Sequence, residues 1–182
     1  LASTLASSPD MPRVLLQGSA VGAYGDRGDD ELTETEPYGS TFFAELVERW
    51  EAATAPAAAA GVRVVHLRTS IVLSARGGAL GRLLPLVRLG LGGRLGSGRQ
   101  FWSWITLHDE VRAISHLLTA DVQGPVNLAA GADRNADVVR ALAATWHRPA
   151  VLAVPAPVLR VVLGDFASEV LGSARAVPAA LT

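Results

Sequence analysis

Two short segments of the sequence carry many of the side chains that could do chemistry. The first, Gly18 to Gly28, reads GSAVGAYGDRG and contains Ser19 and Tyr24, and the second, Arg68 to Ser74, reads RTSIVLS. Each segment follows a short apolar run that is typical of a buried strand. Ligands of open α/β sheets bind beyond the carboxyl ends of the strands, so these two segments are the first candidates for a binding or catalytic site.

A glycine-rich stretch in the middle of the chain adds further candidates. Arg94 and Arg99 lie in it, and their guanidinium groups would suit an anionic substrate such as a nucleotide diphosphate. The alternative is a flexible, exposed loop. Trp102 follows and fits either the wall of a cleft or the core. The four histidines are dispersed, so we expect no metal site.

Composition excludes several classes of function. The 182 residues are 49% hydrophobic and 18% charged, and all sixteen basic residues are arginine. The net charge of −1 argues against a nucleic-acid partner, which usually requires a basic excess. The absence of cysteine excludes disulfides and thiolate catalysis. The absence of lysine excludes Schiff bases, a P-loop lysine and a catalytic Tyr–Lys pair.

Hydropathy predicts a cytoplasmic protein without a membrane partner. The most apolar tail stretch, residues 150–159, is interrupted by Pro155 and Pro157, and a spanning helix needs about 20 residues. The chain begins with Leu1 rather than methionine. We therefore expect a processed product or a fragment of a longer protein.

Segments with strand and helix patterns alternate along the chain. Their alternation predicts an α/β fold with a mainly parallel sheet, and a small C-terminal subdomain that divides the chain into residues 1–150 and 151–182. In the first predicted helix, the apolar face comprises Phe43, Leu46, Val47 and Trp50. Predicted strands cover residues 14–17, 62–67, 102–106, 126–129 and 151–154, and predicted helices cover residues 40–60, 79–89, 109–119, 135–145 and 157–171.

Helix boundaries follow from capping residues and from proline. Asp109 is expected to cap the helix over 109–119, and Asp133 or Asn135 the helix over 135–145, because short polar side chains accept hydrogen bonds from free N–H groups. Pro56 is expected to kink or shorten the end of the helix over 40–60.

Four strings in fixed order resemble one known family. They are GSAVGAYGDRG, ELTETEPYGSTFFAELVERWEAA, GVRVVHLRTSIVLS and GGALGRLLPLVRLGLGGRLGSGRQFWSWI. The chain resembles the extended short-chain dehydrogenase/reductases. More closely, it resembles their atypical branch of nucleoside-diphosphate-sugar epimerases of the YfcH-like, SulA-like type. The resemblance runs from Arg13 to Val177 and includes the C-terminal string VPAP followed by Leu163-Gly164.

The resemblance implies a partial Rossmann-type, doubly wound parallel sheet. Family members begin with a strand and a Gly-x-x-Gly-x-x-Gly cofactor turn, and no such turn precedes Arg13. We therefore expect the N-terminal half of the Rossmann domain to be missing here. It also implies that NAD or NADP is bound by the full-length protein only.

Family roles can be carried over to matching positions. Ser19 would orient the substrate oxygen, and Tyr38 stands at the position of the catalytic tyrosine, with Phe42 where the family's lysine should be. The open alternatives are that Ser19 bonds a turn N–H and that Tyr38 packs on the sheet. The predicted cofactor-binding residues are Ser19, Arg68, Thr69, Ser70 and Val72, and the predicted substrate-binding residues are Tyr24, Arg94, Arg99 and Trp102.

The predicted function is that of a fragment of an NAD(P)-dependent epimerase/dehydratase-like oxidoreductase. Its substrate would be a small molecule with a carbonyl or hydroxyl group, for which a nucleotide-linked sugar is one candidate. A second copy of the chain is a candidate partner. The alternatives are a non-catalytic nucleotide-binding or regulatory protein of the same fold, and a stand-alone interaction module.

Overall fold

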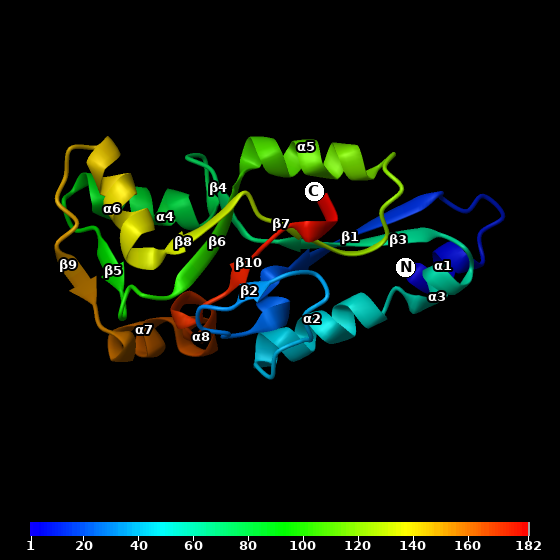
Figure 1. Ribbon diagram of the computed structural model, residues 1–182, viewed down its shortest axis with the longest axis horizontal. Coiled ribbons are helices and arrows are strands. Elements are labelled where there is room, and N and C mark those ends of the chain that lie inside the picture. Colours follow the sequence, from blue (N-terminus) through cyan, green and yellow to red (C-terminus); the bar gives the residue numbers. More distant parts are fainter. Residues whose placement is uncertain (182) are drawn as a thin grey trace.

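The computed structural model describes residues 1–181, leaving aside the side chains at 79, 82 and 83. Its centre is a parallel sheet of β1 (Val14–Ala20), β3 (Arg63–Thr69) and β7 (Gly124–Leu128), in the order β1-β3-β7. Figure 1 shows α5 (Leu107–Leu117) along one face of this sheet and α2 (Phe42–Ala52) along the other. The predicted α/β class is confirmed.

The two faces of the sheet differ in chemistry. On the face toward α5, alternate residues such as Val65 and Leu67 pack with Leu117 from the helix. The remaining members of this core cluster are Ile105, Val126 and Leu128. Because side chains alternate across a strand, the residues between them point toward α2. Near the carboxyl ends of the strands those residues are polar and form the site described below, whereas Leu15 and Val64, nearer the start of the strands, pack with Ala57.

A smaller mixed sheet extends the molecule at one end. It contains β4 (Ile71–Leu73), β6 (Phe101–Thr106) and β8 (Gly131–Arg134), with β6 parallel to β4 and antiparallel to β8. The helices α4 (Gly78–Arg88) and α6 (Asn135–Thr145) lie at the same end (Figure 1). The sequence did not indicate β8, because its residues GADR lack alternating apolar positions.

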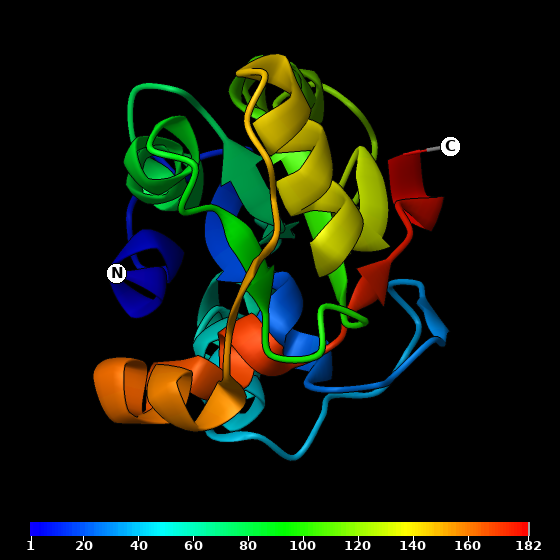
Figure 2. The same ribbon diagram turned by 90° about the vertical axis from the view of Figure 1, so that its left-hand side faces the viewer.

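The C-terminal segment pairs with earlier parts of the chain through two short strands. β9 (Leu152–Val154) pairs with β5 (Gly93–Leu95), and β10 (Arg175–Ala176) pairs with β2 (Glu31–Leu32), both in parallel. Figure 2 shows the long connection from α6 down to α7 (Ala156–Leu163). α8 (Ala167–Leu171) follows α7. The division at residue 151 stays a prediction.

Two predicted helices are broken in the structure. The helix predicted over 40–60 consists of α2 and α3 (Ala55–Ala59), and Pro56 stands in the first turn of α3, where its missing N–H costs nothing. The helix predicted over 157–171 is interrupted at Gly164, whose φ of 58° does not fit a helix. A short helix, α1 (Ala2–Ala6), precedes β1.

Other boundaries were predicted well, although their caps were not. α6 has the predicted bounds, but its cap residue is Arg134, which makes no side-chain cap bond. α5 begins two residues early, because Thr106 rather than Asp109 caps it. The Thr106 hydroxyl accepts from the Asp109 N–H at 3.1 Å and donates to the Asp109 carboxylate at 2.7 Å.

Residues 1–181 contain neither a membrane-spanning helix nor a cluster of metal-ligating side chains. None of the helices described there is long and apolar enough to cross a membrane. In the same residues, no group of three or more His, Asp or Glu side chains is arranged to hold a metal ion.

Candidate functional site

Three polar residues form one rung across the parallel sheet. Ser19 of β1 is in register with Arg68 of β3, and Arg68 is in register with Asn127 of β7. Neighbouring residues in register point to the same face of a sheet. All three side chains are therefore directed toward α2 near the carboxyl ends of the strands, and all three residues are buried.

Glu51 of α2 is the acceptor at the centre of this rung. Its carboxylate accepts hydrogen bonds from the Ser19 hydroxyl at 2.5 Å and the Tyr38 hydroxyl at 2.6 Å. Arg68 donates to both carboxylate oxygens, from Nε and Nη2, at 3.0 Å each. His66 Nδ1 lies 3.5 Å from the same group. Glu51 and Arg68 side chains are each 3% exposed, so this is a buried, two-pronged ion pair.

The network stabilises the charged forms of its two central groups. Burial alone would raise the pKa of Glu51, but hydrogen bonds from Arg68, Ser19 and Tyr38 hold that pKa below its ordinary value. Burial works against the Arg68 charge as well. Its hydrogen bonds to Glu51 and Tyr24 nevertheless raise the pKa of Arg68.

Tyr38 shows the opposite behaviour from an activated phenol. Burial, together with its hydrogen bond to Glu51 and the charge of that carboxylate, raises the pKa of Tyr38 to about 12. The Arg68 guanidinium lies 5.0 Å from the centre of the Tyr38 ring. Tyr38 therefore serves as a hydrogen-bond donor to a carboxylate at neutral pH.

Tyr24 closes the other side of the network. Its side chain is fully buried, accepts from Arg68 Nη1 at 3.0 Å and donates to Asn127 Oδ1 at 2.7 Å. Burial raises its pKa. This position leaves Tyr24 no surface for the predicted contact with substrate. The 3% exposure of Arg68 likewise leaves no free face for the predicted contact with a cofactor.

The remaining predicted cofactor residues follow Arg68 in the chain. The Thr69 hydroxyl donates to Glu110 at 2.8 Å, and the Ser70 hydroxyl donates to the Leu128 carbonyl at 2.7 Å. Val72 packs against the core on the α5 side. The side chains of Thr69, Ser70 and Val72 therefore contact other parts of the protein, and a ligand could bind the backbone of this segment.

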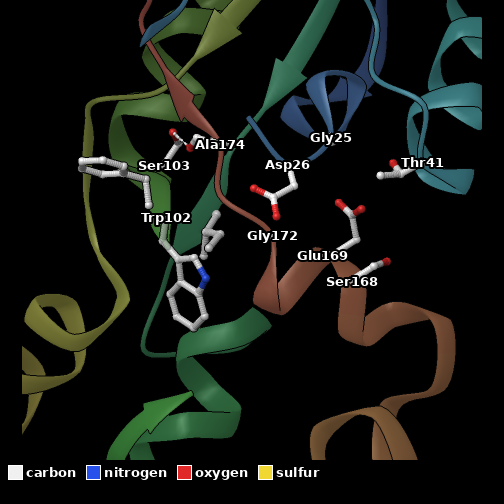
Figure 3. Close-up of a pocket in the computed structure, with 12 residues that line it drawn as sticks. Gly25, Asp26, Thr41, Trp102, Ser103, Ser168, Glu169, Gly172 and Ala174 are labelled. Carbon is white, nitrogen blue, oxygen red and sulfur yellow. Dashed lines mark hydrogen bonds between the residues drawn. The ribbon is translucent and has the colours of Figure 1, made fainter. Parts of the chain in front are cut away.

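A small pocket of about 60 Å³, partly open to solvent, lies where the two sheets and the C-terminal segment meet. Figure 3 shows Asp26 and Glu169 with their carboxylates toward this space and the Trp102 ring beside it. We call it the inner pocket. Its wall includes Gly22 and Asp26 after β1, Thr41 before α2, Ile71 of β4, Trp102 of β6 and Glu169 of α8.

The pocket gathers only some of the predicted site residues. Trp102 lines it and donates from its indole N–H to the Val170 carbonyl at 3.1 Å. Ser19 and Tyr38 are not among its lining residues, and neither are Arg94 and Arg99, which are exposed. The predicted catalytic pair and the pocket are thus separate features of this structure.

Sequence reasoning missed several residues of both features. Glu51 lies on the buried face of α2 together with Ala44 and Val47, so the helical spacing of the buried residues includes one acidic residue. Asn127 is the one polar side chain in the buried end of β7, and that isolation was a usable signal. Asp26, on the pocket wall, was not among the predicted site residues, and its neighbour Arg27 binds Glu36.

One family model and several curated proteins match the chain. The model, described as a domain of unknown function (DUF1731), matches residues 154–182. An epimerase family protein of Mycobacterium bovis is 45% identical over 170 residues, and the human epimerase family protein SDR39U1 is 36% identical over 167 residues. These matches cover 92% and 90% of this chain, but 56% and 57% of the relatives. The chain thus spans little more than half the length of these relatives.

Solved structures agree with this homology. The crystal structure of human SDR39U1 isoform 2 with NADPH matches 98% of this chain and 61% of its own, at a TM-score of 0.88 and 31% identity. The crystal structure of the nucleoside-diphosphate sugar epimerase of Corynebacterium glutamicum matches 99% of this chain and 35% of its own chain, with a TM-score of 0.80 and 37% sequence identity. The chain therefore has epimerase family homologues, and its fold is that of the Rossmann-like epimerases.

Proposed function

We propose that this chain forms the substrate side of an NAD(P)-dependent, epimerase-like oxidoreductase that acts on a small carbonyl or hydroxyl compound. The observation that carries the proposal is the position of the inner pocket. It lies past the carboxyl end of β1 and is walled by Ile71, which stands within the segment from Arg68 to Val72 that the family resemblance implies for cofactor binding. The homologue solved with NADPH supports the choice of cofactor.

The described residues fit one part of a dinucleotide site. The backbone from Thr69 to Val72 would lie along the nicotinamide, beside the pocket. Among the described strands, β1 has a neighbour on one edge only, so its other edge is available for a further parallel strand. We propose that the full-length protein completes the cofactor site there. A bound nicotinamide would supply hydride transfer.

The hypotheses for Ser19 and Tyr38 remain part of this proposal. Ser19 uses its proton toward Glu51, and its oxygen can still accept a hydrogen bond. Tyr38 would be a weak acid, since its pKa of about 12 disfavours loss of a proton near neutral pH.

The hydrogen bond from the Tyr38 hydroxyl to Glu51 also favours a second candidate function. A protein that binds the nucleotide without catalysis would have no need of an activated phenol. Such a regulatory protein would keep the Glu51 network for its contribution to the fold alone.

The test begins with a full-length protein that contains this chain. NADPH is titrated by its fluorescence, and turnover is measured with small sugars and ketones. Saturable NADPH binding with turnover supports an enzyme, and saturable binding without turnover supports the regulatory alternative. If NADPH does not bind, the proposal is refuted. Unchanged turnover in Ser19→Ala and Tyr38→Phe would remove these residues from the mechanism.

A further inference from the structure

One carboxylate accepts from both hydroxyl groups of the predicted catalytic pair. The Ser19 hydroxyl donates to Glu51 Oε1 at 2.5 Å, and the Tyr38 hydroxyl donates to Glu51 Oε2 at 2.6 Å. These distances are typical of a hydroxyl that donates to an ionised acceptor. A hydroxyl has a single proton, so Glu51 takes the only proton that each member of the pair can donate.

The carboxylate of Glu51 is itself fixed from the side of the sheet. Arg68 donates to both of its oxygens at 3.0 Å, and His66 Nδ1 lies 3.5 Å from Oε2. Arg68 and His66 are thus the charged and titratable groups that face it from β3, and Tyr38 faces it from the segment before α2. The two-pronged pair sets the plane of the carboxylate, and with it the direction in which the two hydroxyl groups point.

Glu51 stays an acceptor at neutral pH. Burial alone would raise the pKa of its carboxyl group, but hydrogen bonds from Arg68, Ser19 and Tyr38 hold that pKa below its ordinary value. Turning either hydroxyl proton toward a ligand would take a donor away from a carboxylate that is 3% exposed. Leaving a buried charged acceptor short of a donor costs free energy, so we expect both hydroxyl groups to keep their orientation when a ligand arrives.

The pair can therefore offer a ligand only its oxygen atoms. Tyr38 is half-buried, and Ser19 is the next-to-last residue of β1, at the edge of the sheet where ligands of parallel strands bind. A ligand hydroxyl can donate to either oxygen. A carbonyl oxygen has no proton to donate and would meet lone pairs instead.

We propose that Glu51 is the positioning residue of the Ser19–Tyr38 pair, and that by accepting both hydroxyl protons it makes the pair select a substrate hydroxyl over a carbonyl oxygen. This inference rests on the proposed function in taking Ser19 and Tyr38 as groups that meet the substrate. It narrows that function, because the alcohol rather than the carbonyl form of the substrate is the one that the pair holds.

The first experiment compares an alcohol with the ketone of the same carbon skeleton. Saturation-transfer NMR measures binding of cyclohexanol and cyclohexanone to a full-length protein that contains this chain, without added cofactor, so neither probe reacts. We expect the wild type to bind cyclohexanol more tightly. In Glu51→Gln the amide N–H donates to one hydroxyl group, which can then donate its own proton to a ligand. The ratio of the two affinities should shift toward cyclohexanone by roughly tenfold.

Two further variants complete this experiment. Glu48→Gln, on the exposed side of α2, is the matched control. Tyr38→Phe leaves the pair of Glu51 and Arg68 in place and removes one acceptor, so it should weaken cyclohexanol binding more than cyclohexanone binding. It tests the inference even if Glu51→Gln does not fold, and thermal unfolding shows which variants are folded.

The second experiment reads the Tyr38 hydroxyl directly. NMR of protein labelled at the tyrosine Cζ follows its titration, and the Tyr38 signal is the one that Tyr38→Phe removes. In folded Glu51→Gln the pKa of Tyr38 should fall by about one unit or more, because the carboxylate is gone and the Arg68 charge remains. Glu48→Gln should leave it unchanged.

The inference is overturned if the wild type prefers cyclohexanone or binds neither probe. It is also overturned if folded Glu51→Gln loses affinity for both probes by the same factor, as a merely structural role would require, or leaves the pKa of Tyr38 where it is. The proposed function fails separately, through absence of NADPH binding, since neither of these experiments contains the cofactor.

Discussion

Replacing Glu51 by glutamine should destabilise the fold by about 3–5 kcal/mol, the range for removing one partner of a buried ion pair. The substitution keeps the size of the side chain but leaves the Arg68 charge, 3% exposed, without its counter-ion. It also replaces the charged acceptor of the Ser19 and Tyr38 hydroxyl groups. The loss is therefore that of an uncompensated buried cation rather than that of a single hydrogen bond.

Urea unfolding followed by tryptophan fluorescence measures this loss. For a chain of this length, it corresponds to a fall in melting temperature of about 6–20 °C. Asp137→Asn is the control, because its 2.6 Å pair with Arg140 is exposed on α6 and should contribute less than about 1 kcal/mol. A second variant, Glu51→Gln with Arg68→Met, should recover part of the loss because it removes the stranded charge.

The pH dependence of the free energy of unfolding provides an independent test of the ion pair. The folded-state pKa of Glu51 lies below its ordinary value of 4.5, so its contribution is present above pH 4.5 and is lost as the pH falls through the folded-state pKa. The stability difference between wild type and Glu51→Gln should shrink over that range. A Glu51→Gln protein as stable as Asp137→Asn at neutral pH would refute the assignment of a buried ion pair.

Three further predictions address other parts of the chain. Both tyrosines have raised pKa values, so folded protein at pH 10 should show less phenolate absorbance than unfolded protein. The stability that they contribute should be full below pH 10 and lost as the pH rises through their folded-state pKa values, which for Tyr38 is about 12; equal phenolate absorbance of folded and unfolded protein at pH 10 would contradict this. Gly93→Ala places a methyl group directly on the Leu152 carbonyl oxygen and should open the pairing of β5 with β9, which would be seen as faster proteolysis near residue 152. The control is Gly81→Ala in α4, whose methyl group meets nothing within 4 Å and should stabilise the fold by up to about 1 kcal/mol. Equal rates of proteolysis of the two variants would argue against the β5–β9 pairing. Glu169→Gln should raise the stability of the fold at pH 7 but not at pH 4, because burial raises the pKa of Glu169 and the cost of ionising the carboxyl group appears as the pH rises through that pKa. Denaturant unfolding at both pH values measures the difference in stability. A variant less stable than wild type at pH 7 would show that the ionised carboxylate has a partner.

The sequence predicted the elements better than it predicted which faces they bury. In the segment now seen as α2, the apolar period suggested that Leu46 and Trp50 face the core, but they are 46% and 53% exposed. The buried face carries Ala44, Val47 and Glu51 instead. Burial of Glu51 depends on Arg68, which lies seventeen residues away on β3, and a periodicity search within one helix does not include such a partner.

The candidate site was predictable in place but not in composition. The segments after β1 and β3 do meet at one edge of the sheet, as parallel strand order requires, and both contribute to the network or the pocket. Glu169, however, comes from α8, more than 140 residues after Gly22, and no local motif marks it. Its position depends on how the C-terminal segment returns to pair β10 with β2, which is a tertiary contact.

The absence of lysine has a physical consequence for where protons can be exchanged. A lysine beside a phenol lowers the phenol pKa by its positive charge, whereas Tyr38 has a carboxylate beside it and its pKa rises to about 12. Burial raises the pKa of Glu169, and that group lies on the pocket wall. Glu110 also has a raised pKa, but it accepts from Thr69 and lies outside the pocket wall. Among the described residues, Glu169 therefore lies on the pocket wall, whereas the hydroxyl of Tyr38 is bound to Glu51 and lies outside that wall.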